Sequence, residues 1–316
     1  MDPNLEYWQN NGKSFLSRLR IWLNILDPSS ILSSDVEISN AHSLVRRDGN
    51  QLKDEKVSNA WKLSLCSVHA DTGEPISTVF RPQAFLPISA PLVIASFVPH
   101  KGVTPALFWQ FLLQSYCAGF NHANRNATAT PENKTSKKQN LLITGTVAYS
   151  TFAGALPQII IKCLAVSSSS AQAFCRSVLP VPLSVCLAAF SIFVVRSEES
   201  ENGIKVFDSS GNLVGVSREA GFKAVKETAI SRATLFGTTA LVPNLLVLLL
   251  KRGKLAQRNS MMFAPVRHIS TAIVLGLMIP VSFSLFPQLG MIKKEHVEKE
   301  LQILTNDEEL YYHRGL

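Results

Sequence analysis

The sequence predicts an all-α protein: a multi-pass transmembrane helical bundle of five to six spans, with a polar amphipathic N-terminal region and a small β-hairpin in one loop. Only 17% of the 316 residues are charged, against about 25% in soluble domains. After Arg81, the charged residues leave six uncharged windows of 18 to 25 residues, each long enough to cross a hydrocarbon core. This pattern argues against a soluble globular enzyme.

The composition changes at Arg81 and divides the chain into three parts. They are a polar amphipathic N-terminal region (1–81), a transmembrane helical region (82–292) with a structured loop (196–232), and a polar C-terminal tail (293–316). The N-terminal region carries nine Lys and Arg against ten Asp and Glu, so it lacks the long uncharged runs of the region that follows.

An amphipathic helix is predicted near the start of the chain. Its apolar residues, at helical spacing, are Phe15, Leu16, Leu19, Trp22, Leu23 and Leu26. Asp27-Pro28 ends the pattern. Two interpretations stay open, because such a helix can lie on a membrane surface or pack on the rest of the protein.

The six uncharged windows define the candidate spans. They are 82–100, 102–124, 139–161, 177–195, 233–250 and 268–292. Window 233–250 is the strongest, since it contains seven leucines and two valines, which favour insertion. Window 102–124 contains several amide side chains, so it is either a span buried among other helices or a helix at a cavity.

The distribution of basic residues bears on the number of spans. Six spans put 23 Lys and Arg on one side of the membrane and 8 on the other, as the positive-inside rule favours. If window 102–124 does not cross, five spans remain and the bias nearly disappears. Long loops count little in this rule, so both five and six spans stay open.

The loop 196–232 is expected to fold. Residues 204–207 and 213–216 read as two short strands around the turn at 208–212. Ser217 is then a candidate cap for an amphipathic helix, 218–232, that leads into the strong span.

The most informative local feature is a polar stripe in window 102–124. Gln110, Gln114, Cys117, Asn121 and Asn124 are 4, 3, 4 and 3 residues apart, which puts them within an arc of about 80° on a helix. Amide groups donate and accept hydrogen bonds without net charge, which suits a zwitterionic or hydroxylated small molecule. The stripe is either a transport pathway or a set of hydrogen bonds that hold helices together. The candidate substrate-pathway residues are Gln110, Gln114, Ser115, Asn121 and Asn124.

No catalytic, metal or cofactor site is expected. The sequence contains no HExxH, GxSxG, phosphate-loop, EF-hand or CxxC pattern. His69 and Asp71 could bind a metal or transfer a proton, but their turn-like HADTGE segment favours a structural turn. The net charge of +8 does not indicate nucleic-acid binding, since the basic residues lie where loops flank the spans.

Several motifs, in order along the chain, resemble those of the sideroflexin family. HADTGE (69–74) is similar to the family's HPDTGE, and TPALFWQ (104–110), with the amides that follow it, is similar to TPAxxFWQWxNQSFNAxxNYTNRN. Further matches in the family's order are Ser231-Arg232, Phe286-Pro287-Gln288 and Arg314-Gly315-Leu316. The family-motif residues carried over from these matches are His69, Asp71, Thr72, Gly73, Glu74, Trp109, Arg125, Arg232, Pro287 and Gln288.

The resemblance implies a multi-pass protein of the mitochondrial inner membrane. Since some sideroflexins carry serine and related amino acids, it implies a transporter of an amino acid or small metabolite and not an enzyme. The implied partners are the lipid bilayer and this substrate. No cofactor is implied.

The chain departs from the family pattern inside the amide stripe. Leu113 and Cys117 stand where the family has asparagines, and His122-Ala123 replaces Tyr-Thr. The loss of one good hydrogen-bonding partner typically costs about 1–3 kcal/mol, so the departures argue against serine as the substrate.

These departures are most similar to the divergent fourth vertebrate branch of the family. That branch implies an alternative role, in which a membrane-embedded factor supports respiratory complex I assembly and iron or iron–sulfur homeostasis together with mitochondrial assembly partners. The sequence shows no Cys or His cluster that would hold iron.

Overall fold

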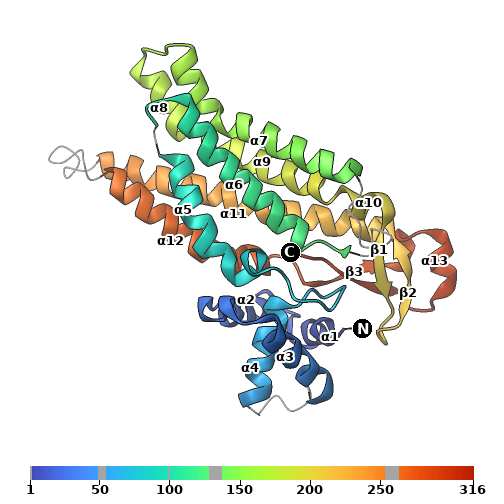
Figure 1. Ribbon diagram of the computed structural model, residues 1–316. Helices are drawn as coiled ribbons and strands as arrows, with labels where there is room; N and C mark the ends of the chain where they lie inside the picture. Colours follow the sequence, from blue (N-terminus) through green and yellow to red (C-terminus); the bar gives the residue numbers. More distant parts are fainter. Residues whose placement is uncertain (1, 49–54, 99, 128–136, 253–262) are drawn as a thin grey trace.

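The structure is a computed structural model that describes residues 2–48, 55–98, 100–127, 137–252 and 263–316. Long helices form a bundle, and shorter N-terminal helices and a small β-sheet lie together near one end of it (Figure 1). The predicted helical bundle and its β-hairpin are therefore confirmed.

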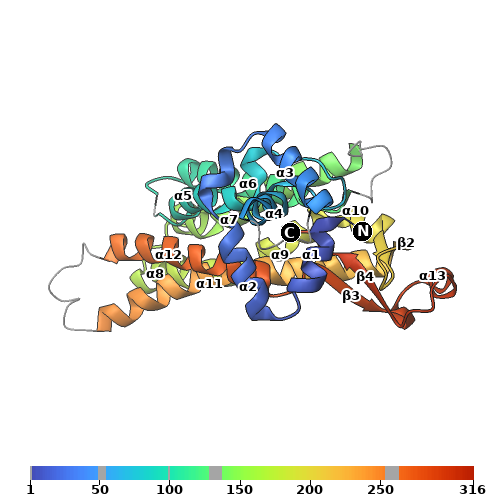
Figure 2. The same ribbon diagram turned by 90° about the horizontal axis from the view of Figure 1, so that it is seen from below.

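The N-terminal region folds into a layer of helices below the bundle in Figure 1, and this layer faces the viewer in Figure 2. Its helices are α1 (Pro3–Asn11), α2 (Phe15–Ile25), α3 (Asp35–Asp48) and α4 (Glu55–Ser67). Ser14 and Ser17 begin α2 with reciprocal hydrogen bonds between each side chain and the other's backbone N–H, the capping-box arrangement. Between α3 and α4, Val45, Val57 and Trp61 form a small core of their own.

Helix α2 corresponds to the predicted amphipathic helix and packs on the rest of the protein. Its Trp22 is buried, and the ring centroid lies 5.0 Å from that of Phe283. The opposite face of α2 leaves Leu16 and Leu23 exposed, at 72% and 61%. The packing interpretation is thus confirmed for one face, and the other face presents apolar side chains outward.

The bundle is built from the segments that the uncharged windows marked. Its helices are α5 (Phe85–Phe97), α6 (Val103–Ala123), α7 (Lys137–Cys163), α8 (Ser169–Ser177), α9 (Pro180–Val195), α11 (Arg218–Arg252) and α12 (Phe263–Ser284). The predicted helix 218–232 and the strong span 233–250 form one continuous helix, α11. The last window was too long, because α12 ends at Ser284 and Leu289–Lys293 forms a strand.

Three stretches among the described residues are long and apolar enough to cross a membrane by length and composition. They are Ser169–Val195, Arg218–Leu250 and Phe263–Ser284. Helix α5 has 13 residues, which extend about 20 Å at 1.5 Å each, and α6 and α7 carry inward-facing polar residues. The bundle helices run back and forth between the end with the sheet and the opposite end near α8 (Figure 1). The number of crossings, five or six, stays a prediction.

The outer surface of the bundle is apolar, as a lipid-facing surface requires. Large exposed hydrophobic side chains include Phe108, Leu141, Phe152, Leu245, Leu249, Ile273 and Leu277. Exposed apolar area of this extent marks contact with a membrane or with other proteins.

The β-sheet joins the loop after α9 to the C-terminal part of the chain. Its strands are β1 (Ile204–Phe207), β2 (Leu213–Ser217), β3 (Leu289–Lys293) and β4 (Glu309–His313), in the order β2-β1-β4-β3, and every pair is antiparallel. The predicted hairpin is β1–β2. The short helices α10 (Ser197–Asn202) and α13 (Lys299–Leu304) flank the sheet.

The segment that we expected to be a polar C-terminal tail is therefore folded. It supplies β4 and α13, and Leu310 and Tyr312 of β4 are buried in one core with Ile204 and Val206 of β1. The local sequence did not indicate this strand, because β4 is short and follows acidic residues. One of its two partners, β1, also lies about 100 positions earlier in the chain, while the other, β3, is about 20 positions away.

An aromatic core fills the junction between the N-terminal layer and the bundle. The ring centroids of Phe85 and Phe120 are 4.5 Å apart, and Phe283 lies 6.1 Å from Phe85. Trp22 closes this group from α2. The core fixes the ends of α5, α6 and α12, and the candidate functional site begins above it.

Candidate functional site

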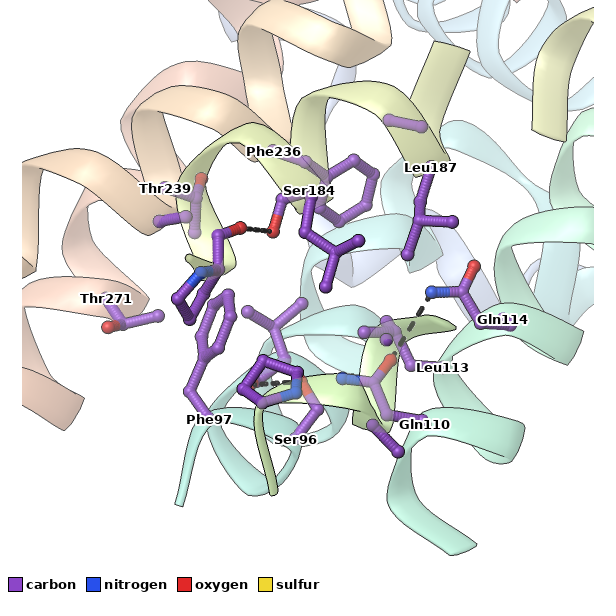
Figure 3. A pocket seen from close by; sticks show the side chains of 18 of the residues that line it. Ser96, Phe97, Gln110, Leu113, Gln114, Ser184, Leu187, Phe236, Thr239 and Thr271 are labelled. Carbon is purple, nitrogen blue, oxygen red and sulfur yellow. Dashed lines mark hydrogen bonds between the residues drawn. The ribbon is translucent and has the colours of Figure 1, made fainter. Parts of the chain in front are cut away.

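A cavity of about 120 Å³ lies inside the bundle, lined from α5, α6, α7, α8, α9, α11 and α12. Figure 3 shows Gln110 and Gln114 of α6 on one side of it, with Ser184 of α9 and Thr239 of α11 across from them. The structure thus brings the predicted polar stripe to a space that a small molecule can occupy. Leu113 and Cys117, the two positions where the family pattern has asparagines, line the same space.

Gln110 and Gln114 are held in position by their neighbours. Gln114 Nε2 donates a hydrogen bond to Gln110 Oε1 at 3.4 Å (Figure 3). Gln110 is buried and lies directly against Gly154 of α7, where a Cβ would overlap its side-chain amide. Glycine at this position therefore lets α7 approach α6 closely while Gln110 keeps its place at the cavity.

Asn121 also lines the cavity, but its hydrogen bonding differs from that of Gln110 and Gln114. Its side chain is buried, and Oδ1 has no hydrogen-bond partner among the described residues. A buried amide oxygen without a partner is costly and usually indicates a ligand or water that completes it. Asn121 is therefore the amide of the stripe that is most clearly available to a substrate.

Two of the predicted pathway residues do not line the cavity. Asn124 follows the last residue of α6, where the helical phase ends, and its Nδ2 donates to the backbone oxygens of Phe80 and Phe120 at 2.9 Å each. Ser115 is half-buried on α6 and does not line the cavity, because one step along a helix turns a side chain by about 100°. The structure thus places Asn124 in hydrogen bonds at the end of α6 and Ser115 off this cavity.

Residues that the stripe could not reveal complete the cavity from other helices. Polar side chains that line it include Ser96, His100, Gln158, Ser191, Asn244 and Thr271. They lie on different segments of the chain, so no single periodic pattern groups them. Gln158 Nε2 donates to the His100 backbone oxygen at 2.7 Å, which links α7 to the turn after α5.

Arg232 of α11 is the most unusual residue at the cavity. The sequence marked it only as part of a family motif. It is 2% exposed, and neither Nε nor Nη2 has a hydrogen-bond partner among the described residues. Its guanidinium carbon lies 5.7, 5.5 and 4.6 Å from the ring centroids of Phe85, Phe120 and Phe283. These are cation–π distances, so the aromatic core supports the charge from one side while the cavity lies beside it.

Most of the other motif residues lie outside the cavity, where the N-terminal layer, the end of α6 and the sheet converge. We call this group the polar junction and define it by His69, Asp71, Arg125, Asn126, Arg196, Glu198, Glu199, His313 and Arg314. Its members come from distant parts of the chain, and the contacts between them are buried or half-buried.

The HADTGE segment is the N-terminal part of the polar junction, and its contacts are structural. His69 Nε2 lies 2.6 Å from the Arg125 backbone oxygen, and Asp71 pairs with Lys205 of β1 at 3.0 Å. Thr72 Oγ1 accepts a hydrogen bond from the Glu74 N–H, and Gly73 takes a left-handed φ of +74°, which favours glycine. Within the described residues no group of three metal-ligating side chains occurs. The interpretation of a structural turn is the one that the geometry supports.

A buried ion pair occupies the centre of the polar junction. Arg196 Nε and Nη2 donate to Glu199 Oε1 and Oε2 at 2.5 and 2.7 Å, and both side chains are fully buried. Asn126 Nδ2 donates to the same carboxylate at 2.7 Å. Arg125 adds a second pair, with 3.6 Å between its Nη2 and Glu198 Oε2. This arrangement ties the end of α6 to α10.

The remaining motif residues hold the end of the chain. Arg314 is buried; its N–H donates to the Gln288 oxygen at 2.9 Å, and its Nε donates to the Pro287 oxygen at 3.1 Å. Trp109, by contrast, is half-buried on α6 beside Phe108, and it belongs to neither the cavity nor the polar junction.

The polar junction should make the stability of the protein depend on pH. Burial, together with the nearby His69, lowers the pKa of His313 to about 3, while an unfolded histidine has a pKa of about 6.5. His313 Nδ1 lies 2.9 Å from Asn126 Oδ1, to which the neutral ring donates. Between these pKa values only the unfolded state binds a proton. The free energy of unfolding is therefore highest above pH 6.5 and decreases as the pH drops toward 3.

At pH 5.5 this proton linkage should lower the free energy of unfolding by about 1 kcal/mol relative to neutral pH. Unfolding of purified protein in detergent, followed against pH, measures the loss. A His313→Gln variant should show a smaller loss, whereas His296→Gln, at an exposed histidine, should behave as the native chain. Equal pH dependence of all three proteins would contradict the assignment.

The comparisons with known proteins agree with the motifs. The family model described as Sideroflexins matches residues 2–316. The chain is 65% identical to Sideroflexin-4 of Danio rerio, over 100% of both chains. It is 36% identical to Sideroflexin-4 of Homo sapiens, with 100% of this chain and 93% of that one covered, and 30% identical to Sideroflexin-5 of Homo sapiens, with 96% and 90% covered. No solved structure is significantly similar to the chain.

Proposed function

Because the chain belongs to the sideroflexin family, we propose that it is a multi-pass carrier of the mitochondrial inner membrane, and that an amino acid or another small metabolite passes through the cavity between its helices. One observation carries this proposal: among the described residues, the cavity collects buried polar atoms that have no hydrogen-bond partner, Asn121 Oδ1 and the Nε and Nη2 of Arg232. In a membrane such residues generally mark substrate or ion pathways.

The size of the cavity supports a small substrate. A cavity of about 150 Å³ holds a molecule of the size of benzene, so about 120 Å³ suits a ligand of no more than about six non-hydrogen atoms. Polar groups from several helices surround it, so a ligand can exchange its hydration for protein contacts.

Serine is disfavoured as this substrate. Leu113 and Cys117, the positions where the family pattern has asparagines, both line the cavity and are buried. The departures therefore fall on the surface that a substrate would contact, and they replace amide groups with side chains that form weak hydrogen bonds or none.

An Asn121→Ala variant should lose uptake into proteoliposomes by at least tenfold, since one good hydrogen bond to a polar substrate is worth about 1–3 kcal/mol. Ser115→Ala is the matched control, because Ser115 lies on the same helix and does not line the cavity. Native uptake is measured first with a panel of radiolabelled amino acids and small metabolites. Equal uptake by both variants would contradict the proposed pathway.

The family branch also supports a second proposal, a role in respiratory complex I assembly and in iron or iron–sulfur homeostasis. Exposed apolar side chains outside the bundle would offer a protein contact, among them Ile303 of α13 at 85% exposure. The Asn121→Ala variant separates the two roles: an assembly factor keeps complex I assembly when the cavity is changed, whereas a carrier loses its transport.

A further inference from the structure

We propose that the cavity selects a small organic anion, a hydroxy- or keto-carboxylate, over a zwitterionic amino acid, and that Arg232 pairs with its carboxylate. This inference rests on the proposed carrier function and names the substrate class. It follows from the charges that line the cavity and from the state of Arg232.

The charged residues that line the cavity have one sign. Arg176, Arg232 and Arg267 contribute to its wall, and no Asp or Glu does among the described residues. None of the three arginines forms an ion pair within the described part of the chain. A cavity lined by charge of one sign attracts ligands of the opposite sign.

The surroundings of Arg232 favour the binding of an anion. Its guanidinium is buried, and Nε and Nη2 have no hydrogen-bond partner within the described part of the chain. These two donors are spaced to bind a carboxylate with both of its oxygens. The three phenylalanine rings cover it from the side of the aromatic core, so that the cavity is the side from which a counter-charge can arrive. Cation–π contacts offset only part of the cost of dehydrating a guanidinium, and a bound carboxylate would supply the rest.

The other two arginines lie toward the opposite end of the cavity. Arg267 lies on α12, 16 residues before Phe283, whose ring is the nearest of the three to the Arg232 guanidinium. This separation corresponds to about 24 Å along the helix. Arg176 of α8 is exposed and Arg267 is half-buried. They are thus placed to attract an anion at the opening before it reaches Arg232.

A zwitterion is less well matched to this wall. Its carboxylate could pair with Arg232, but the described residues that line the cavity offer its ammonium group no carboxylate, only neutral acceptors such as Asn121 Oδ1. The family pattern has two more amides, at the positions of Leu113 and Cys117, and those amides would add neutral acceptors for an ammonium group. This chain lacks those two amides and keeps the arginines, so its cavity favours an anion over a zwitterion.

The test uses pairs of molecules of equal size that differ only in one group. L-Lactate and L-alanine share a skeleton, as do D-glycerate and D-serine; each pair exchanges a hydroxyl for an ammonium group. Uptake of the four radiolabelled compounds is measured at pH 7 into proteoliposomes that contain the full native chain. We expect the anion of each pair to be taken up at least tenfold faster than the amino acid.

Variants assign this preference to the arginines. Arg232→Gln should reduce anion uptake at least tenfold and abolish the preference, and Arg232→Lys should retain part of both, since it keeps the charge without the planar fork. Arg267→Gln, away from the aromatic core, should slow anion uptake by about two- to fivefold. This variant still tests the inference if the Arg232 variants unfold. Elution profile and thermal midpoint in detergent report folding.

The outcomes separate this inference from the proposed function. Amino-acid uptake equal to or faster than anion uptake by the native chain overturns the anion preference and leaves the carrier function standing. A folded Arg232→Gln variant with native anion uptake overturns the role of Arg232. No uptake of any of the four compounds overturns the inference, and failure of the whole metabolite panel as well overturns the carrier proposal.

Discussion

A Glu199→Gln substitution is expected to lower the free energy of unfolding by about 3–5 kcal/mol, because it leaves the buried Arg196 guanidinium without its counter-charge. Arg196 and Glu199 are both fully buried and are joined by two hydrogen bonds of 2.5 and 2.7 Å. Glutamine would also turn a side-chain NH₂ donor toward the donors of Arg196 or Asn126. Unfolding in detergent, followed by heat or denaturant, measures the effect.

The matched control for this substitution lies on the same short helix. Glu201 pairs with Lys138 at 2.8 Å, but both side chains are more than half exposed, and exposed ion pairs contribute only about 0–1 kcal/mol. Glu201→Gln should therefore change the stability little. If the two variants unfold at the same midpoint, the polar junction does not hold the fold together as its geometry indicates.

This contrast explains why so many motif residues lie away from the cavity. His69, Asp71, Arg125 and Gln288 bind backbone or charged groups that connect segments far apart in the sequence. Their task in this structure is to join the N-terminal layer, the end of α6 and the sheet. A motif defined by a family can therefore record a fold constraint as readily as a substrate contact.

Much of the bundle could be predicted because membranes leave a strong signal in a sequence. Uncharged windows located α5, α6, α7, α9, α11 and α12, since a charge facing lipid is costly. The 3.6-residue period of a helix placed Gln110, Gln114 and Asn121 on one face, and that face meets the cavity. Alternating residues around a turn located the hairpin β1–β2.

The rest depended on contacts between distant segments. Strands β3 and β4 are short, and β4 pairs with a strand about 100 positions earlier, which no local pattern reveals. Asn124 is the last residue of the predicted stripe, but the helix ends before it, so its side chain caps the helix end and does not line the cavity. Arg232 lies just before a strong span, and only the structure shows that the cavity, and not the loop, surrounds it.

The two departures at Leu113 and Cys117 have the largest expected effect on substrate choice. Both side chains line the cavity, and asparagine at each position would restore the family's amides and add hydrogen-bonding groups at the substrate surface. Two such groups, at about 1–3 kcal/mol each for a polar ligand, are enough to change uptake of serine by tenfold or more. Ser115→Asn adds an amide on the same helix outside the cavity and is the control.

The most direct test of whether this cavity selects the substrate is therefore serine uptake into proteoliposomes by a Leu113→Asn/Cys117→Asn variant, compared with the native chain and with Ser115→Asn. We predict that the double variant takes up serine at least tenfold faster than the native chain, and that Ser115→Asn does not. Native-like serine uptake by a double variant that inserts and folds normally would contradict the assignment of this cavity as the site of substrate selection.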